Sequence, residues 1–202
     1  MPNFAYEIKH QNTNIKENDT TLLTISLEYP KFSDPKLTKQ NACLERFSAT
    51  LQALLQDSLH KEASAALNLL PEILPYQLSS TVTPSLQSEA YLSVFFDLFI
   101  FAGGVRGAEY RLAQNFHLKS DGALFLTHFF PDSKDLPHTI SDQIIAQYPA
   151  FHAQAHALRR YFSPERFYLS KDGICIFYNA GQISPLASGI QVFTLPHPEI
   201  MP

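Results

Sequence analysis

YLSVFFDLFIFA, residues Tyr91–Ala102, is the stretch that decides the fold. Its residues alternate between two sets, and both sets are apolar apart from Ser93 and Asp97. A strand that is apolar on both faces is typical of the centre of a sheet with helices over at least one face. The loop Gly103–Gly107 (GGVRG) then turns the chain into a second expected strand, Tyr110–Leu118. The stretch therefore predicts a central strand in a sheet that helices cover.

Hydrophobic periodicity predicts the elements on either side of this strand. A period of two in Thr20–Tyr29 predicts a strand that ends at Pro30, because proline cannot continue a central ladder. Apolar residues three and four apart predict a helix over Leu37–Leu70, with at most one break. The other expected elements are strands at Tyr76–Thr83, Phe167–Leu169, Ile174–Tyr178 and Gln191–Leu195, a hairpin turn at Lys119–Gly122 followed by Leu124–Phe130, helices at Leu136–Tyr148 and Phe151–Phe162, and an N-cap at Asp132 or Ser133.

The order of these elements predicts the fold class. Helices and hairpins are segregated, without regular alternation of strand and helix, which favours an α+β fold: a mainly antiparallel sheet with helices packed on it. A length of 202 residues suits one domain over residues 1–202. We expect residues 1–19 to be an irregular or peripheral segment of that domain.

Composition and cysteine usage exclude several classes of protein. The chain is 45% hydrophobic with a net charge of −4, so it has no basic excess for binding nucleic acid. Cys43 and Cys175 are too few for a disulfide framework or a thiolate zinc site. Two unpaired thiols are favoured, and a single long-range disulfide remains the alternative.

No segment predicts membrane insertion or export. The run Tyr91–Ala102 is the longest apolar one, and it is shorter than the about 20 residues that span a bilayer. Met1–His10 lacks the basic and apolar regions of a signal peptide. We expect a cytoplasmic protein if Met1 is the native start, and an extracytoplasmic one if an export segment has been removed.

The candidate ligand-binding residues surround the glycine-rich loop. They are Asp97, Gly103, Gly104, Arg106, Gly107 and Tyr110. The loop lacks the spacing of a dinucleotide fingerprint and the lysine of a P-loop, so a wide turn with positive φ angles is favoured over an anion nest. Arg106 could contact a carboxylate or phosphate of a ligand, and the alternative is a solvated arginine, which is more common for a lone exposed one. Asp97 stands among aromatic residues, and it is either a ligand-contacting acid or a structural acid whose partner is Tyr110 or Arg111.

Signals for a metal or a catalytic site are weak. His152 and His156 would share one helix face and could supply two metal ligands. A third ligand is not evident, and position 153 is alanine instead of the glutamate of the zinc-protease pattern, so a solvated helix face is favoured. The nucleophile-elbow and cysteine-protease patterns are also missing. The sequence therefore predicts no catalytic residue, no metal and no cofactor.

Four stretches together resemble a known family. They are LEYPKF at Leu27–Phe32, YLSVFFDLFIFAGGVRG at Tyr91–Gly107, NFHLKSDGALFLTHFF at Asn115–Phe130 and FYLSKDGICIFYNAGQISPLASGIQVF at Phe167–Phe193. They resemble the domain of unknown function in the extracellular part of RsiV-type anti-sigma factors and the non-catalytic part of PdaC-type peptidoglycan deacetylases, which also occurs in short stand-alone bacterial proteins. The resemblance implies an α+β fold, and RsiV-type members bind lysozyme as receptors.

This chain also departs from the family pattern. The family loop generally reads Gly-Gly-Ala-His-Gly, and Val105 and Arg106 replace its alanine and histidine. Phe99 and Phe101 stand where tyrosines are common, and Leu186 stands where an aromatic residue is common. A family site that uses those groups would be altered here.

The resemblance implies a function without catalytic residues. We expect a non-enzymatic binding or sensing domain whose ligand is a cell-wall glycan or a protein such as lysozyme. The alternatives are a self-associating structural module and, less favoured, a hydrolase that uses Asp97.

Overall fold

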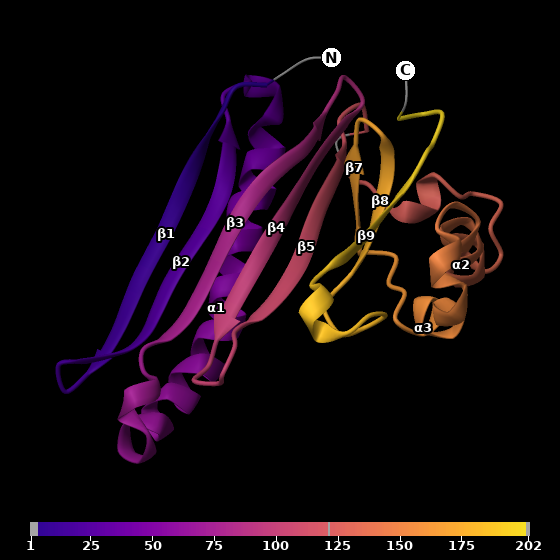
Figure 1. Ribbon diagram of the computed structural model, residues 1–202. Helices are drawn as coiled ribbons and strands as arrows, with labels where there is room; N and C mark the ends of the chain where they lie inside the picture. The colour runs from indigo at the N-terminus through magenta and orange to yellow at the C-terminus, as the bar shows by residue number, and fades with distance from the viewer. Residues whose placement is uncertain (1–3, 121, 201–202) are drawn as a thin grey trace. The chain divides into compact units, whose positions relative to one another are not determined.

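The computed structural model describes residues 4–120 and 122–200 (Figure 1). The chain divides into two compact units. The N-terminal unit comprises Phe4–Thr83 and Phe96–Glu109, and the C-terminal unit comprises Pro84–Phe95 and the described residues from 110 to 200. The expected single domain over residues 1–202 stays a prediction.

Strand pairing confirms the predicted fold class. Six strands pair in the order β1-β2-β3-β4-β5-β6, and three more in the order β7-β8-β9. Their bounds are β1 Tyr6–Glu17, β2 Thr20–Phe32, β3 Tyr76–Gln87, β4 Tyr91–Phe101, β5 Ala108–His117, β6 Gly122–Ala123, β7 Phe167–Ser170, β8 Gly173–Tyr178 and β9 Gln191–Leu195. Pairing is antiparallel for β1 with β2, β5 with β6, and throughout β7-β8-β9, whereas β2 and β3 run parallel. The class is therefore α+β with a mainly antiparallel sheet.

A long helix packs on the sheet of the N-terminal unit. Helix α1, Thr38–Leu69, lies along β2 (Figure 1), which confirms the predicted helix and shows it unbroken. Pro71 begins a 3-10 turn directly after it, because proline cannot donate to a continuing helix. The core between helix and strands consists of Leu22, Leu23, Ile25, Leu27, Leu59, Ala63, Ala66, Tyr76, Leu78 and Leu98. Leu44 of α1 is buried and Leu51 and Leu55 pack against this core, as the periodicity predicts, whereas Leu54 is exposed.

Strand β2 begins at Thr20 as predicted, but it contains a bulge near its start and ends later than predicted. Near its start, Ile15 pairs with Leu23 and Lys16 with Thr21, so Leu22 is an extra residue and forms a bulge. A bulge turns the chain locally, and this accounts for the burial of two consecutive leucines. The predicted end at Pro30 is wrong: β2 continues to Phe32.

The position of Pro30 in the sheet explains why it is tolerated. Its partner across the antiparallel pair is Ile8. The parallel register between β2 and β3 ends at Ser26, four residues earlier, so the missing N–H of Pro30 breaks no bond of that ladder.

The expected irregular segment at residues 1–19 is corrected over most of its length. Tyr6–Glu17 forms the regular strand β1, although its place at the end of the strand order is peripheral. Asn18 and Asp19 both have positive φ, 47° and 65°, as the two central residues of a tight hairpin turn require. Residues 1–3 lie outside the described part of the chain.

The C-terminal unit has its own core. Helices α2, Leu136–Gln147, and α3, Ala155–Arg160, pack with the three-stranded sheet, and α2 contacts β9 (Figure 1). All six residues of β8, the central strand of that sheet, are buried. The core includes Ile140, Ile144, Leu158, Phe167, Leu169, Ile174, Ile176, Tyr178, Phe193 and Leu195.

Three local predictions in this unit are wrong. The N-cap of α2 is Asp135, whose Oδ1 accepts from the N–H of His138 at 3.2 Å, and not Asp132 or Ser133. Residues 151–162 do not form one helix, because the segment begins as a 3-10 helix at Pro149–Gln154 before α3. The expected segment Leu124–Phe130 is not a strand either: β6 covers only Gly122–Ala123, and the chain then passes into the 3-10 turn Leu126–His128.

A buried polar network ties β7 to β4 and β5 within the C-terminal unit. Ser93 Oγ donates to Asn115 Oδ1 at 2.6 Å and accepts from the N–H of Leu169 at 2.8 Å. Asn115 Nδ2 donates to the carbonyl of Phe167 at 2.8 Å. The buried serine and asparagine thus give main-chain groups of β7 side-chain hydrogen-bond partners.

Candidate functional site

The predicted glycine-rich loop lies in the N-terminal unit, between β4 and β5. Gly103 has a φ of 75°, and a Cβ there would meet the side chain of Ile73 and come within 3.0 Å of Tyr76 Cε1. A Cβ at Gly107 would meet the ring of Phe99. The predicted turn with positive φ is therefore confirmed at Gly103, and both ends of the loop approach neighbouring groups closely.

The tip of this loop is different. Gly104 does not have a positive φ, and the nearest non-neighbour atom to a Cβ there would be Arg106 O at 3.6 Å. The expectation of a positive φ is wrong for this glycine. Gly104 and Arg106 are exposed, and Val105 is exposed completely. The loop thus has close-packed ends and a tip in water.

The other predicted site residues are placed separately. Asp97 is half-buried on β4 in the same unit. Tyr110 is exposed and belongs to the C-terminal unit, so its grouping with the loop stays a prediction. His152 and His156 are exposed on the 3-10 helix and on α3 respectively, rather than on one helix. Within residues 4–120 and 122–200, no group of three histidine, cysteine or acidic residues could hold a metal. Cys43 is exposed and Cys175 is buried, and both are free thiols.

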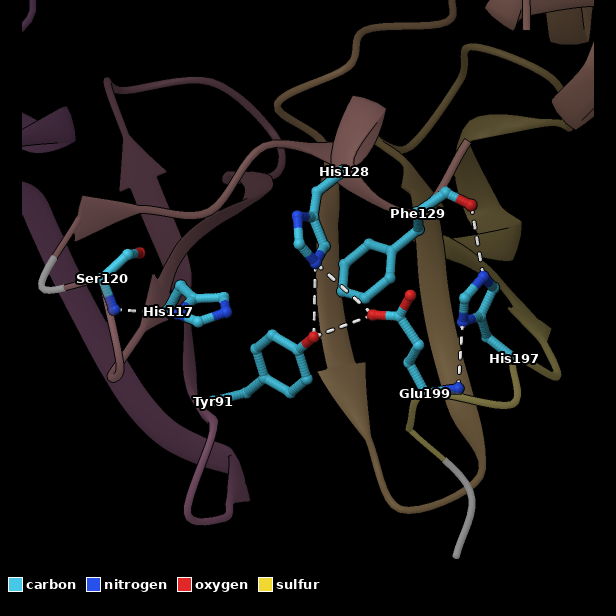
Figure 2. Close-up of polar contacts among 7 residues, drawn as sticks. All are labelled: Tyr91, His117, Ser120, His128, Phe129, His197 and Glu199. Atoms are coloured by element: carbon cyan, nitrogen blue, oxygen red, sulfur yellow. Dashed lines mark hydrogen bonds and ion pairs between the residues drawn. The ribbon is translucent and has the colours of Figure 1, made fainter. Parts of the chain in front are cut away.

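A second group of polar side chains gathers in the C-terminal unit (Figure 2). We call it the His/Glu cluster, and it consists of Tyr91, His117, His128, Phe129, His197 and Glu199. Tyr91 begins β4, His117 ends β5, and His128 ends the 3-10 turn after β6. Glu199 follows β9 near the end of the described chain. Four separate segments therefore bring these side chains together.

Tyr91 is the centre of the cluster. Its hydroxyl donates to Glu199 Oε2 at 2.9 Å. His128 Nε2 lies 3.3 Å from the same hydroxyl and 3.4 Å from Glu199 Oε2. Because the tyrosine proton points to Glu199, the network assigns the proton of His128 to Nε2, which donates to the tyrosine oxygen. Burial of the ring, followed by the hydrogen bond and the charge of Glu199, raises the pKa of Tyr91 to about 12. Tyr91 therefore stays a protonated donor at neutral pH.

The remaining histidines are fixed by main-chain groups. His197 Nδ1 accepts from the N–H of Glu199 at 3.3 Å, and His197 Nε2 donates to the carbonyl of Phe129 at 3.2 Å. His117 Nδ1 accepts from the N–H of Ser120 at 3.1 Å. A nitrogen that accepts carries no proton, so the network assigns both rings to the neutral form with hydrogen on Nε2.

Edge-to-face ring contacts complete the cluster. Tyr91 and His117 have centroids 5.3 Å apart at 88°, and His128 and Phe129 have centroids 5.1 Å apart at 89°. Phe129 also contacts His197 at 5.2 Å. Such contacts favour one ring orientation, so the polar atoms are held in defined directions.

The chain is similar to known proteins in both family and fold. The model of a family described as "Protein of unknown function (DUF3298)" matches residues 36–197. The chain belongs to the DUF3298 family. None of the curated proteins matches it.

Solved structures of DUF3298 proteins share the fold. A family member from Bacteroides fragilis NCTC 9343 has a TM-score of 0.64 and 20% identity, over 96% of this chain and 91% of that chain. A DUF3298 family protein from Pseudomonas aeruginosa PAO1 has a TM-score of 0.61 and 15% identity, over 100% of this chain and 98% of that chain. Membership confirms the predicted domain of unknown function, and the link to RsiV-type and PdaC-type proteins stays a prediction.

Sequence reasoning did not identify the His/Glu cluster of this DUF3298 chain. Its histidines are far apart and have no metal-ligand spacing, and the 3-10 turn that carries His128 has no strong sequence signal. His117 and His128 do lie in one of the stretches that carry the family resemblance, Asn115–Phe130.

Among the described residues, every helix is too short or too polar to span a membrane.

Proposed function

We propose that this DUF3298 chain is a non-enzymatic binding or sensing domain. Its ligand is a cell-wall glycan or a protein such as lysozyme, in line with the resemblance to RsiV-type and PdaC-type proteins. The family membership and the shared fold are compatible with this function.

The glycine-rich loop is the observation that carries the proposal. Gly103 and Gly107 pack closely at its ends, while Val105 and Arg106 extend into water at its tip. A loop with fixed ends loses less conformational entropy on binding than a flexible one. An exposed β-branched side chain beside a guanidinium offers an apolar contact together with a donor to anionic or polar groups. This combination suits recognition better than catalysis, for which a positioned acid or base is required.

A binding titration with a loop variant tests the proposal. Lysozyme and soluble peptidoglycan fragments are titrated into the wild-type chain, Arg106→Ala and the control Lys134→Ala, which removes an exposed cation from the other unit. We expect at least one ligand to bind, and Arg106→Ala to bind it about tenfold more weakly, as for the loss of one charged hydrogen bond. Failure of both ligands to bind wild type would contradict the proposed function. Equal affinity of Arg106→Ala and wild type would exclude the loop tip as the contact.

Self-association is the second candidate function, because Leu54 and Leu69 on α1 are largely exposed. Exposed leucines on one helix would be covered in an assembly of several copies. Light scattering tests this candidate directly, and a monomer over the working concentration range would exclude it.

The hydrolase alternative needs a histidine or second carboxylate beside Asp97 and predicts cleavage of the glycan or acyl substrate.

A further inference from the structure

We infer that the His/Glu cluster is a saccharide-binding subsite in which Glu199 accepts from ligand hydroxyl groups and His117 donates to them. This inference rests on the proposed binding function and adds to it the chemical class of ligand and a second set of contact residues. The cluster lies in the C-terminal unit, whereas the glycine-rich loop lies in the N-terminal unit.

Three polar atoms of the cluster are available to a ligand. Within residues 4–120 and 122–200, no protein group hydrogen-bonds to Glu199 Oε1, His117 Nε2 or His128 Nδ1, because the contacts of these side chains use their other polar atom. Glu199 Oε1 is an acceptor, His117 Nε2 carries a proton and donates, and His128 Nδ1 accepts when the ring is neutral. The side chains of Glu199 and His128 are 50% and 41% exposed, so a ligand in solution can reach them.

This set of atoms fits hydroxyl groups better than charged groups. A hydroxyl both donates and accepts, and the cluster contains both acceptors and a donor, with the ring of His117 against those of Tyr91 and His128. An anionic ligand would be repelled by the Glu199 carboxylate. A cationic ligand would pair with Glu199 and leave the His117 donor without a partner, at a cost if that donor is desolvated. A neutral polyhydroxylated ligand can use both groups.

The cluster is also organised before a ligand arrives. Tyr91 is 7% exposed and holds the Glu199 carboxylate through its 2.9 Å hydrogen bond (Figure 2). The N–H of Ser120 fixes His117 in the same way. Side chains that are already ordered lose little rotamer freedom on binding. Weakly binding ligands such as sugars gain most from this arrangement.

An exposed aromatic side chain precedes the turn that carries His128. Phe125 is 67% exposed, and its carbonyl accepts from the N–H of His128 at 3.0 Å. Ligand pockets typically combine apolar or aromatic surface with a few placed polar groups. Phe125 is therefore an exposed aromatic surface three residues from His128 along the chain, of the kind that packs on the C–H face of a sugar ring.

Two substitutions separate the ligand contacts from the fold. Glu199→Gln removes the charge but keeps a side-chain oxygen to which Tyr91 can donate. His117→Asn keeps an acceptor near the Nδ1 position for the Ser120 N–H and removes the Nε2 donor. The matched controls are Glu165→Gln and His152→Asn, which make the same changes at exposed positions of the same unit.

The test is a titration of the full chain with chitotriose, a neutral trimer of N-acetylglucosamine, followed by amide chemical shifts. We expect saturable shifts at His117, His128 and Glu199, with affinity weakened about tenfold or more by Glu199→Gln and by His117→Asn. The two control variants should bind as wild type does. The dispersion of each spectrum shows whether the variant is folded.

The other outcomes overturn the inference in distinguishable ways. If chitotriose gives no saturable shifts at millimolar concentration, the saccharide class is wrong. Saccharide binding that both cluster variants retain would remove the subsite and leave the proposed binding function standing. If lysozyme alone shifts the cluster amides, the surface binds a protein instead. Failure of every ligand to bind would contradict the proposed function itself.

Discussion

Replacement of Gly103 by alanine should destabilise the N-terminal unit. At a φ of 75° a residue with a Cβ pays about 1–2 kcal/mol for the left-handed conformation. The new Cβ would also meet Ile73 and lie 3.0 Å from Tyr76 Cε1, so both side chains must shift. Against this, alanine restricts the unfolded chain and recovers about 0.4–1 kcal/mol. The two conformational effects leave a net loss of about 0–1.6 kcal/mol, and the forced shift of Ile73 and Tyr76 raises the expected loss in the free energy of unfolding to about 1–2 kcal/mol.

Gly104→Ala is the matched control for this substitution. Gly104 has no positive φ, and its added Cβ would be 3.6 Å from Arg106 O, an ordinary contact. Its effect on the free energy of unfolding should stay within about 0.5 kcal/mol. Urea unfolding followed by circular dichroism measures both variants, and a loss of about 1–2 kcal/mol lowers the midpoint by roughly 0.5 M or somewhat more. Equal losses at the two positions, or no loss at Gly103, would refute the argument that the loop ends are conformationally fixed.

Three further predictions concern the C-terminal unit and the loop tip. Asn115→Ala leaves the Ser93 hydroxyl and the Phe167 carbonyl buried without their partner and should cost about 2–4 kcal/mol in denaturant unfolding; a loss under about 1 kcal/mol would show that the network contributes little. Tyr91 ionises near pH 10 in the unfolded chain and near 12 in the folded one, so its contribution is complete below pH 10 and lost as pH rises to 12. The difference between the urea midpoints of wild type and Tyr91→Phe should therefore shrink as pH rises from 10 to 12. Parallel pH profiles of the two midpoints would contradict the raised pKa of Tyr91. Arg106→Ala should change stability by less than about 0.5 kcal/mol, because the side chain is exposed; a larger drop in melting temperature would mean that the guanidinium supports the loop.

The long periodic elements were predictable from sequence. The sequence of α1 carries an apolar pattern of period 3.6, and the sequence of β4 is apolar on both faces. The structure has both elements within one or two residues of their predicted bounds. The hairpin β7–β8 and the strand β9 follow from short apolar runs that end at a glycine turn or a proline. These signals are local, so tertiary context changes them little.

Elements that depend on their neighbours were not predictable. β1 is polar and lies at the end of the strand order, so it lacks the alternation that marks a half-buried strand. Pro30 is tolerated because the parallel ladder of β2 has already ended, a fact of pairing and not of sequence. The N-cap of α2 is Asp135 instead of the predicted Asp132 or Ser133, because several side chains in that segment can accept the capping hydrogen bond.

One candidate site could be predicted from the sequence and the other could not. The loop ends could be anticipated because glycines after a strand suggest positive φ, and Gly103 has it while Gly104 does not. The His/Glu cluster could not be anticipated, since Tyr91 and Glu199 are 108 residues apart and meet only through the fold. Its signal in the sequence amounts to histidines without any recognisable spacing.

The most direct test of the account is whether the chain binds its proposed ligands without changing them. Calorimetric titration of the wild-type chain with soluble peptidoglycan fragments and with lysozyme measures binding, and mass spectrometry of the recovered fragments measures cleavage. The account predicts saturable binding to at least one of them and fragments of unchanged mass. An absence of binding to both, or the appearance of cleaved fragments, would contradict a non-enzymatic binding domain.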